Sequence, residues 1–175
     1  SGVTTLLSLA PGGAEANGMS RANDISGNGR FVTFESCATN LIADDSNGLC
    51  DVFLLDRQSD TIERINISSS GTAANQQGDA FRGHWSRVSA DGRFVVFMSM
   101  ASNLVPEAAT VQRRIYLRDR VASTTTLVGS GRLGAITPDG RYVVFSAAPQ
   151  IRLWDRVTMT IELVSVGQGG AVEDG

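Results

Sequence analysis

Short apolar runs separated by turn-forming residues dominate this chain. Runs of six or seven mostly apolar or β-branched residues, such as 30–36, 51–56 and 61–67, alternate with stretches rich in Gly, Asn, Asp and Ser. None of these runs shows the period of about 3.6 residues that an amphipathic helix would need. The pattern therefore predicts an all-β protein built from short strands and tight turns.

Two sequence signatures recur three times in the same order. The first, Asn/Asp-Gly-Arg-Phe/Tyr-Val-Thr/Val-Phe, occupies 28–34, 91–97 and 139–145. The second, an apolar run that ends in Asp-Arg, occupies 52–57, 115–120 and 151–156. We expect a hairpin turn at each Gly-Arg pair, because glycine tolerates the positive φ of such turns. In the second signature the Asp side chain can bond the backbone amides of the next turn.

The spacing of the repeats predicts the fold. Successive Gly-Arg pairs are 63 and 48 residues apart, close to the roughly 40–50 residues of a four-stranded propeller blade with variable loops. We therefore expect four-stranded antiparallel β-propeller blades at about 21–67, 84–128 and 132–166. Residues 1–20 would supply one extra N-terminal strand, around 3–9, and the connector of a preceding blade.

The two ends of the chain carry similar sequences that fall at the same point of the repeat. Residues 8–18 align with 165–175, with five of the eleven positions identical. A propeller ring needs about four to eight blades. The single unit 1–175 is thus expected to be a segment of a longer propeller, or half of a ring of about six blades that two copies close head to tail.

Charge and hydropathy exclude some classes of function. The net charge is -3, and all 15 basic residues are arginines that are interleaved with aspartates in the repeated turns. This balance does not favour nucleic-acid binding. No stretch of about 18 apolar residues occurs, so we expect no membrane span.

Three long segments carry the candidate binding face. Strand alternation places 37–50, 68–84 and 100–112 on one side of the blades, and the short turns on the other. Long loops on a rigid scaffold are where binding residues concentrate. We therefore expect ligands or partners to bind on this side.

Cys37 and Cys50 stand at the two ends of the first long segment. A disulfide between them would close the loop and would fit an oxidising compartment. The alternative is a pair of unpaired thiols in a cytosolic protein. A zinc site is disfavoured, because two cysteines and one histidine supply too few ligands.

Acidic residues inside this loop are candidate contacts. Asp44, Asp45 and Asn47 are expected on the binding face. Asp45, Asn47 and Asp51 have a spacing that partly resembles a calcium loop, although the complete pattern and its distal Glu are missing. The alternatives are a calcium site and an ordinary acidic turn, and no other cofactor is expected.

The single histidine lies in the connector before the second blade. Arg82, His84 and Trp85 are candidate binding residues near the mouth of a central channel. A role for His84 as a general base or ligand competes with simple packing between blades, and no nucleophile partner follows from spacing. No Gly-x-Ser-x-Gly elbow occurs. We therefore expect no catalytic residues.

A third element completes a family resemblance. Ser-x-Ala-Ser/Thr-Asn-Leu follows the first signature at 36–41 and 99–104, whereas the third repeat departs from it at 146–149. With the Gly-Arg and Asp-Arg signatures, it resembles the WD-like β-propeller repeats of TolB-type bacterial proteins. The resemblance implies a periplasmic or secreted, non-enzymatic propeller that binds a protein partner. The alternative is a propeller fragment of a lyase or peptidase whose catalytic residues lie outside this chain.

Overall fold

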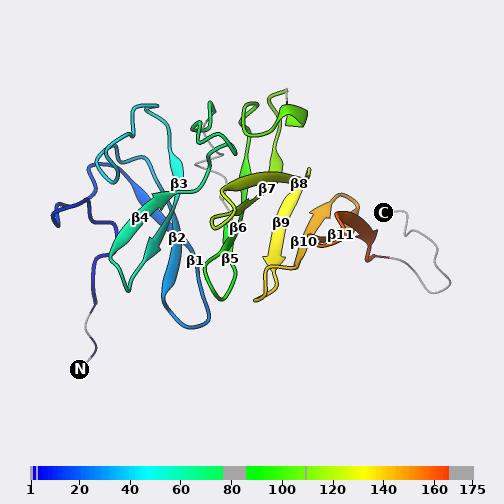
Figure 1. Ribbon diagram of the computed structural model, residues 1–175, viewed down its shortest axis with the longest axis horizontal. Coiled ribbons are helices and arrows are strands. Elements are labelled where there is room, and N and C mark those ends of the chain that lie inside the picture. The colour runs from blue at the N-terminus through cyan, green and yellow to red at the C-terminus, as the bar shows by residue number, and fades with distance from the viewer. Residues whose placement is uncertain (1, 3, 77–85, 109, 166–175) are drawn as a thin grey trace.

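The computed structural model describes residues 2, 4–76, 86–108 and 110–165, and it contains three four-stranded antiparallel sheets (Figure 1). The first consists of β1 (Ser20–Ile25), β2 (Phe31–Ser36), β3 (Asp51–Asp56) and β4 (Thr61–Arg64). The second consists of β5 (Arg87–Val88), β6 (Phe94–Ser99), β7 (Arg114–Asp119) and β8 (Thr124–Gly129). The third consists of β9 (Arg132–Ile136), β10 (Tyr142–Ala147), β11 (Gln150–Asp155) and β12 (Thr160–Leu163).

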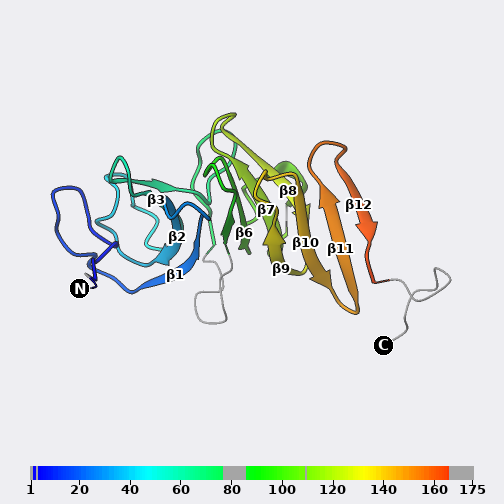
Figure 2. The same cartoon turned by 90° about the horizontal axis from the view of Figure 1, so that it is seen from below.

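Each sheet is a simple meander, in which every strand pairs with its neighbours in sequence. The three sheets, called the first, second and third blades below, stand side by side in an open row (Figure 2). This confirms the all-β fold and its three four-stranded blades. The one helical element of the described residues is a 3₁₀ turn, η1 (Pro106–Ala108). No described helix is long and apolar enough to cross a membrane.

The segment before β1 differs from the expectation. The described residues of the predicted strand, 4–9, contain only one bridge, between Leu9 and Glu15. The outer strand of a blade needs the third strand of that blade as its partner, and the described part of the chain offers none. Leu7 and Ala16 pack instead against the first blade, on the face that includes Phe34.

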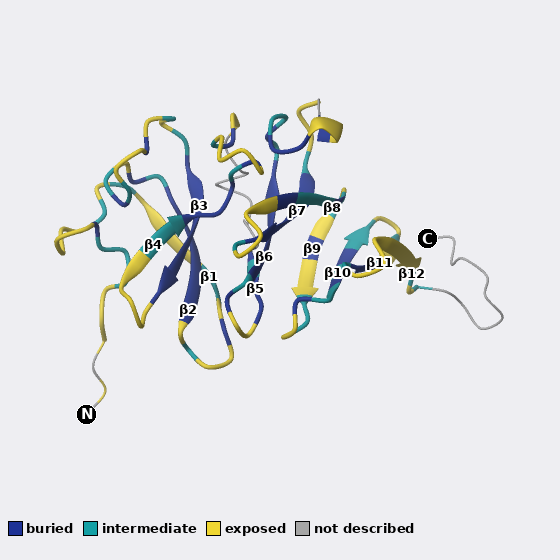
Figure 3. Ribbon diagram, viewed as in Figure 1, coloured by how far each residue is buried: buried dark blue, intermediate teal, exposed yellow. Residues whose placement is uncertain are grey.

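Apolar side chains fill the space between neighbouring blades. Every residue of β2, β3, β6 and β7 is buried, because these strands are covered on both faces. One core cluster joins the first blade, through Phe31 and Leu54, to the second, through Phe97 and Tyr116. A second cluster joins the second blade to the third and includes Trp154. The third blade is more exposed (Figure 3).

The two signatures hold each other together at the turn end of every blade. Arg30 donates two hydrogen bonds to Asp56, from Nε at 2.8 Å and Nη2 at 2.6 Å. In return, Arg57 Nη1 donates to the carbonyl of Gly29 at 2.7 Å. The equivalent arginine–aspartate pairs in the other blades are Arg93–Asp119 and Arg141–Asp155. As expected, the glycines have positive φ, 72° at Gly29, and Asp56 accepts a hydrogen bond from a turn amide.

We predict an acid-dependent loss of stability from these pairs. The hydrogen bond from Arg141 lowers the pKa of Asp155 to about 2, and the arginine partners also lower the pKa of Asp56 and Asp119. An unfolded Asp has a pKa of about 3.9, so the paired carboxylates stabilise the fold above that pH. Their contribution is lost as the pH falls from about 4 to about 2.

Urea unfolding measured between neutral pH and pH 2 tests this prediction. Asp155→Asn should flatten the acid limb of the stability curve, because one of the shifted groups is removed. Asp44→Asn changes the same charge at an exposed residue and serves as the control. An Asp155→Asn curve parallel to that of the wild type would contradict the prediction.

Candidate functional site

The long segments gather at one end of the blades, as strand alternation predicts (Figure 1). They connect β2 to β3, β4 to β5 and β6 to β7. The hairpin turns that carry the Gly-Arg and Asp-Arg pairs occupy the other end. We call the two ends the loop face and the turn face. The predicted segment 68–84 contributes its described residues, 68–76, to the loop face.

Paired asparagines fasten two of the connectors to the loops beside them. The backbone amide of Asn17 donates to Asn40 Oδ1 at 3.0 Å, and Asn40 Nδ2 donates to the carbonyl of Glu15 at 2.9 Å. In the second blade, the Asn75 amide donates to Asn103 Oδ1 at 3.0 Å, and Asn103 Nδ2 donates to the connector backbone at 2.8 Å. The asparagine of the Asn-Leu motif therefore holds the connector against its loop.

A disulfide and a buried ion pair shape the first loop. Cys37 and Cys50 form the predicted disulfide. Arg64 of β4 places Nη2 2.7 Å from Asp45 and Nε 3.1 Å from Asp51. The Arg64 side chain is 9% exposed, and those of Asp45 and Asp51 are 0% and 1% exposed. One buried guanidinium thus balances two buried carboxylates beneath the loop.

Two asparagines complete the hydrogen bonding of Asp51. Asn66 Nδ2 donates to it at 2.6 Å, and Asn47 Nδ2 donates at 3.0 Å. Burial nevertheless raises the pKa of Asp51, because a low-dielectric surrounding disfavours the charged carboxylate. Arg64 and Asn66 act in the opposite direction. The Asp51 carboxylate therefore contacts Arg64, Asn66 and Asn47 within the protein.

The predicted site residues separate into different environments. Asp44 is exposed and Asn47 half-buried on the loop face, whereas Asp45 is buried against Arg64. The other three candidates, Arg82, His84 and Trp85, lie outside the described residues. The structure thus leaves only Asp44 and Asn47 of the first-loop candidates within reach of a partner.

The calcium hypothesis concerns Asp45, Asn47 and Asp51. Here the positive charge between the two carboxylates comes from Arg64, and Asn47 turns its amide nitrogen toward Asp51. Within the described ranges, no group of three or more His, Cys, Asp or Glu side chains is placed to hold a metal ion. These contacts favour the acidic-turn alternative, and calcium binding stays a prediction.

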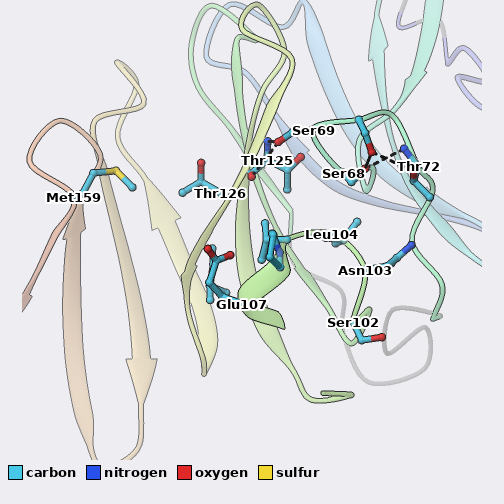
Figure 4. Close-up of a pocket in the computed structure, with 14 residues that line it drawn as sticks. Ser68, Ser69, Thr72, Ser102, Asn103, Leu104, Glu107, Thr125, Thr126 and Met159 are labelled. Carbon is cyan, nitrogen blue, oxygen red and sulfur yellow. Dashed lines mark hydrogen bonds between the residues drawn. The ribbon is translucent and has the colours of Figure 1, made fainter. Parts of the chain in front are cut away.

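An open pocket that the sequence did not indicate lies beside the second blade (Figure 4). Its volume is about 900 Å³, within the range of ligand pockets. Half of its lining residues carry hydroxyl groups, and these residues come from the connector, from β8 and from the loop after β6. Its polar lining includes Ser68, Ser69, Ser70, Thr72, Ser102, Asn103, Glu107, Thr125 and Thr126.

The first blade has a smaller pocket at the equivalent place. It measures about 440 Å³, and Pro11, Leu41, Ile42 and Ile62 make much of its wall apolar. In both blades the pocket lies between a connector, a loop and an outer strand that are far apart in sequence. Sequence spacing could not reveal such a site, because it arises only when the connector docks.

Comparison with known proteins gives the class of fold. No protein-family model and no curated protein sequence matches the chain. The β-propeller domain of the Trilobed protease from Pyrococcus furiosus is similar, with a TM-score of 0.52 and 10% identity over 83% of this chain and 41% of that chain. A prolyl endopeptidase structure gives a TM-score of 0.52 and 13% identity over 86% of this chain and 22% of that chain.

The chain is therefore an open three-blade segment of a β-propeller. TolB from Acinetobacter baumannii is also similar, with a TM-score of 0.49 and 15% identity over 86% of this chain and 33% of that chain. The chain spans less than half the length of each of these proteins.

Proposed function

We propose that this chain is a non-enzymatic binding module whose loop face contacts a protein partner. The observation that carries the proposal is the asymmetry between the two ends of the blades. The turn face consists of short turns with arginine–aspartate pairs bonded within each blade. The loop face carries long segments that asparagine pairs and a disulfide hold in place, and such fixed loops are suited to recognition.

The disulfide also supports a location outside the cytoplasm. Disulfides such as Cys37–Cys50 persist mainly in oxidising compartments. We therefore propose that the module works in the periplasmic or secreted fraction of a bacterium.

A second candidate is a propeller segment of a larger lyase or peptidase. It is favoured by the Trilobed protease, whose similar part is named as a β-propeller domain. On this alternative the catalytic residues lie outside the chain, and the loop face would contact another domain of the same protein.

Affinity capture with matched variants tests the binding proposal. The loop-face variant Asp44→Asn/Glu107→Gln removes two negative charges from exposed residues. The control Gln58→Arg/Val121→Arg changes the net charge equally at exposed residues of the turn face. A protein captured from a bacterial envelope extract, once identified and purified, should bind the loop-face variant about tenfold more weakly and the control as tightly as the wild type.

Two results would overturn the proposal. One is equal binding by both variants, which would move the contact away from the loop face. The other is turnover of a glycan or peptide by the purified chain, which would make it an enzyme in its own right.

A further inference from the structure

The first and second blades each present an aromatic ring to a glycine of the next blade. A Cβ atom built on Gly92 would lie 2.5 Å from the ring of Phe31, and one built on Gly140 would collide with the ring of Phe94. Both glycines belong to Gly-Arg turns. Only glycine lets the turn approach the neighbouring ring so closely.

An arginine of the next blade covers the same ring. The guanidinium of Arg120 lies 5.7 Å from the centre of the Phe31 ring, and that of Arg156 lies 4.1 Å from the centre of the Phe94 ring. Arg120 Nε also donates to Glu63 Oε2 at 2.8 Å. The contact between blades thus combines a ring, a glycine, an arginine and, in the first interface, a carboxylate.

The third blade repeats the ring and the carboxylate without a covering neighbour. Tyr142 occupies the position of Phe31 and Phe94 but is only half-buried, whereas Phe31 is 5% exposed and Phe94 3%. Glu162 is exposed on β12 and pairs with Leu153. Glu63 pairs in the same way with the equivalent residue of β3, so Glu162 stands in the position of Glu63.

Another apolar residue of this face is exposed, at the end of the β10–β11 pair that lies away from Tyr142. Ile151 of β11 is 39% exposed, whereas its equivalent in the second blade, Ile115, is fully buried. Figure 3 shows the greater exposure of the third blade, with β12 largely yellow. This face therefore has the chemistry of a contact between blades and lacks its partner among the described residues.

The first blade offers the complementary half. Gly29 has the same positive φ as Gly92, and a Cβ atom there would meet only Arg57 Nη1, at 3.8 Å. Arg57 bonds the Gly29 carbonyl as Arg120 bonds that of Gly92, yet Arg57 is exposed. The glycine and the arginine are present, and no aromatic ring of the described residues packs on Gly29.

The geometry points to a second copy of this chain as the occupant. In this head-to-tail contact, Tyr142 of one copy packs on Gly29 of the other, with Arg57 over the ring and bonded to Glu162. The charges are complementary, and the contact continues the one seen twice within the chain. Such heterologous contacts close into a ring when the rotation allows, and six blades fall within the usual range of about four to eight.

The segment before β1 sets the strength of this contact. Leu7 packs on the face of the first blade that the incoming copy would cover. It must move aside when the second copy binds, which lowers the affinity. We therefore expect an association that depends on protein concentration.

Sedimentation velocity over a concentration series tests the proposal with charge-swapped copies. The variants Arg57→Glu and Glu162→Arg each place like charges at the contact when alone, so each should remain monomeric. An equimolar mixture restores an opposite pair at both contacts of a two-copy ring and should form dimers as the wild type does. No association in the mixture would overturn the proposal.

A glycine pair provides an independent variant. Gly29→Ala places a Cβ atom where the partner's ring would pack and should weaken association by about tenfold or more. Gly12→Ala is the control, because it introduces the same backbone strain at a positive φ of 87°. A Cβ atom at Gly12 would meet no atom within 4 Å, so this variant should associate as the wild type does. A monomeric wild type, or equal association by both variants, would overturn the proposal and assign the exposed face to blades of another polypeptide or segment. Loop-face binding would be unaffected.

Discussion

Arg64→Met is expected to lower the free energy of unfolding by about 3–5 kcal/mol, the usual cost of removing one partner from a buried ion pair. The substitution keeps much of the apolar stem of Arg64 but leaves Asp45 and Asp51 buried without their cation. Urea unfolding at neutral pH measures the loss. In a domain whose total stability is about 5–15 kcal/mol, it would be a large fraction of the whole.

The control keeps the size of the residues and removes the unpaired charges. Adding Asp45→Asn and Asp51→Asn to Arg64→Met should recover part of the lost stability, because amides are cheaper to bury than carboxylates. Arg21→Met, at an exposed arginine, should change stability little. A loss below about 1 kcal/mol for Arg64→Met would show that the pair behaves as a surface salt bridge.

The same loop allows the calcium hypothesis to be tested on the wild-type protein. If Arg64 supplies the cation for Asp45 and Asp51, added calcium should not raise the melting temperature, and a chelator should not lower it. A calcium-dependent rise would instead support the ligand set Asp45, Asn47 and Asp51, since a ligand that binds the native state stabilises it.

The blades could be predicted from sequence because their signals are local. The Gly-Arg turns need a positive φ at glycine, as Gly29 has, and the strands beside them are short apolar runs. Repetition then fixed the number of blades. The segment before β1 could not be predicted in the same way, because a strand forms only where an edge is available to pair with it. Leu7 packs instead on the apolar face of the first blade.

The contacts between the two signatures of a blade could not be predicted from the sequence. Arg30 and Asp56 are 26 residues apart, and nothing in the pattern selects this aspartate among the many available. The register of β2 against β3, which aligns Phe31 with Asp56, brings the two together. The sequence therefore indicated the same turn residues in each repeat but not the ion pair that links the two turns.

The candidate site shows the same limit. The spacing of Asp45, Asn47 and Asp51 indicated oxygen ligands. The positive charge that balances the two aspartates comes instead from Arg64 of β4, which the loop residues do not precede directly. Likewise, the asparagine of the Asn-Leu motif was visible as a repeat, while its partner Asn17 lies in a connector. The groups that a loop contacts therefore depend on which distant segments of the chain fold against it.

Removing the disulfide is expected to cost about 3 kcal/mol, the chain-entropy value for a loop of similar length. Cys37 and Cys50 are 13 residues apart, and their bond ties the end of β2 to the start of β3. Cys37→Ala/Cys50→Ala should lower the urea midpoint, and a reducing agent should destabilise the wild type similarly while leaving the variant unchanged. A variant as stable as the oxidised wild type would contradict this expectation.

The disulfide and the ion pair should also depend on each other. The closed loop keeps Asp45 beside Arg64, whereas an open loop has more conformations in which that carboxylate reaches water. Arg64→Met should therefore cost less in the cysteine-free variant than in the wild type, and the two losses should not add. Strict additivity would mean that β3 and β4 alone position the buried charges and that the disulfide acts only on the unfolded chain.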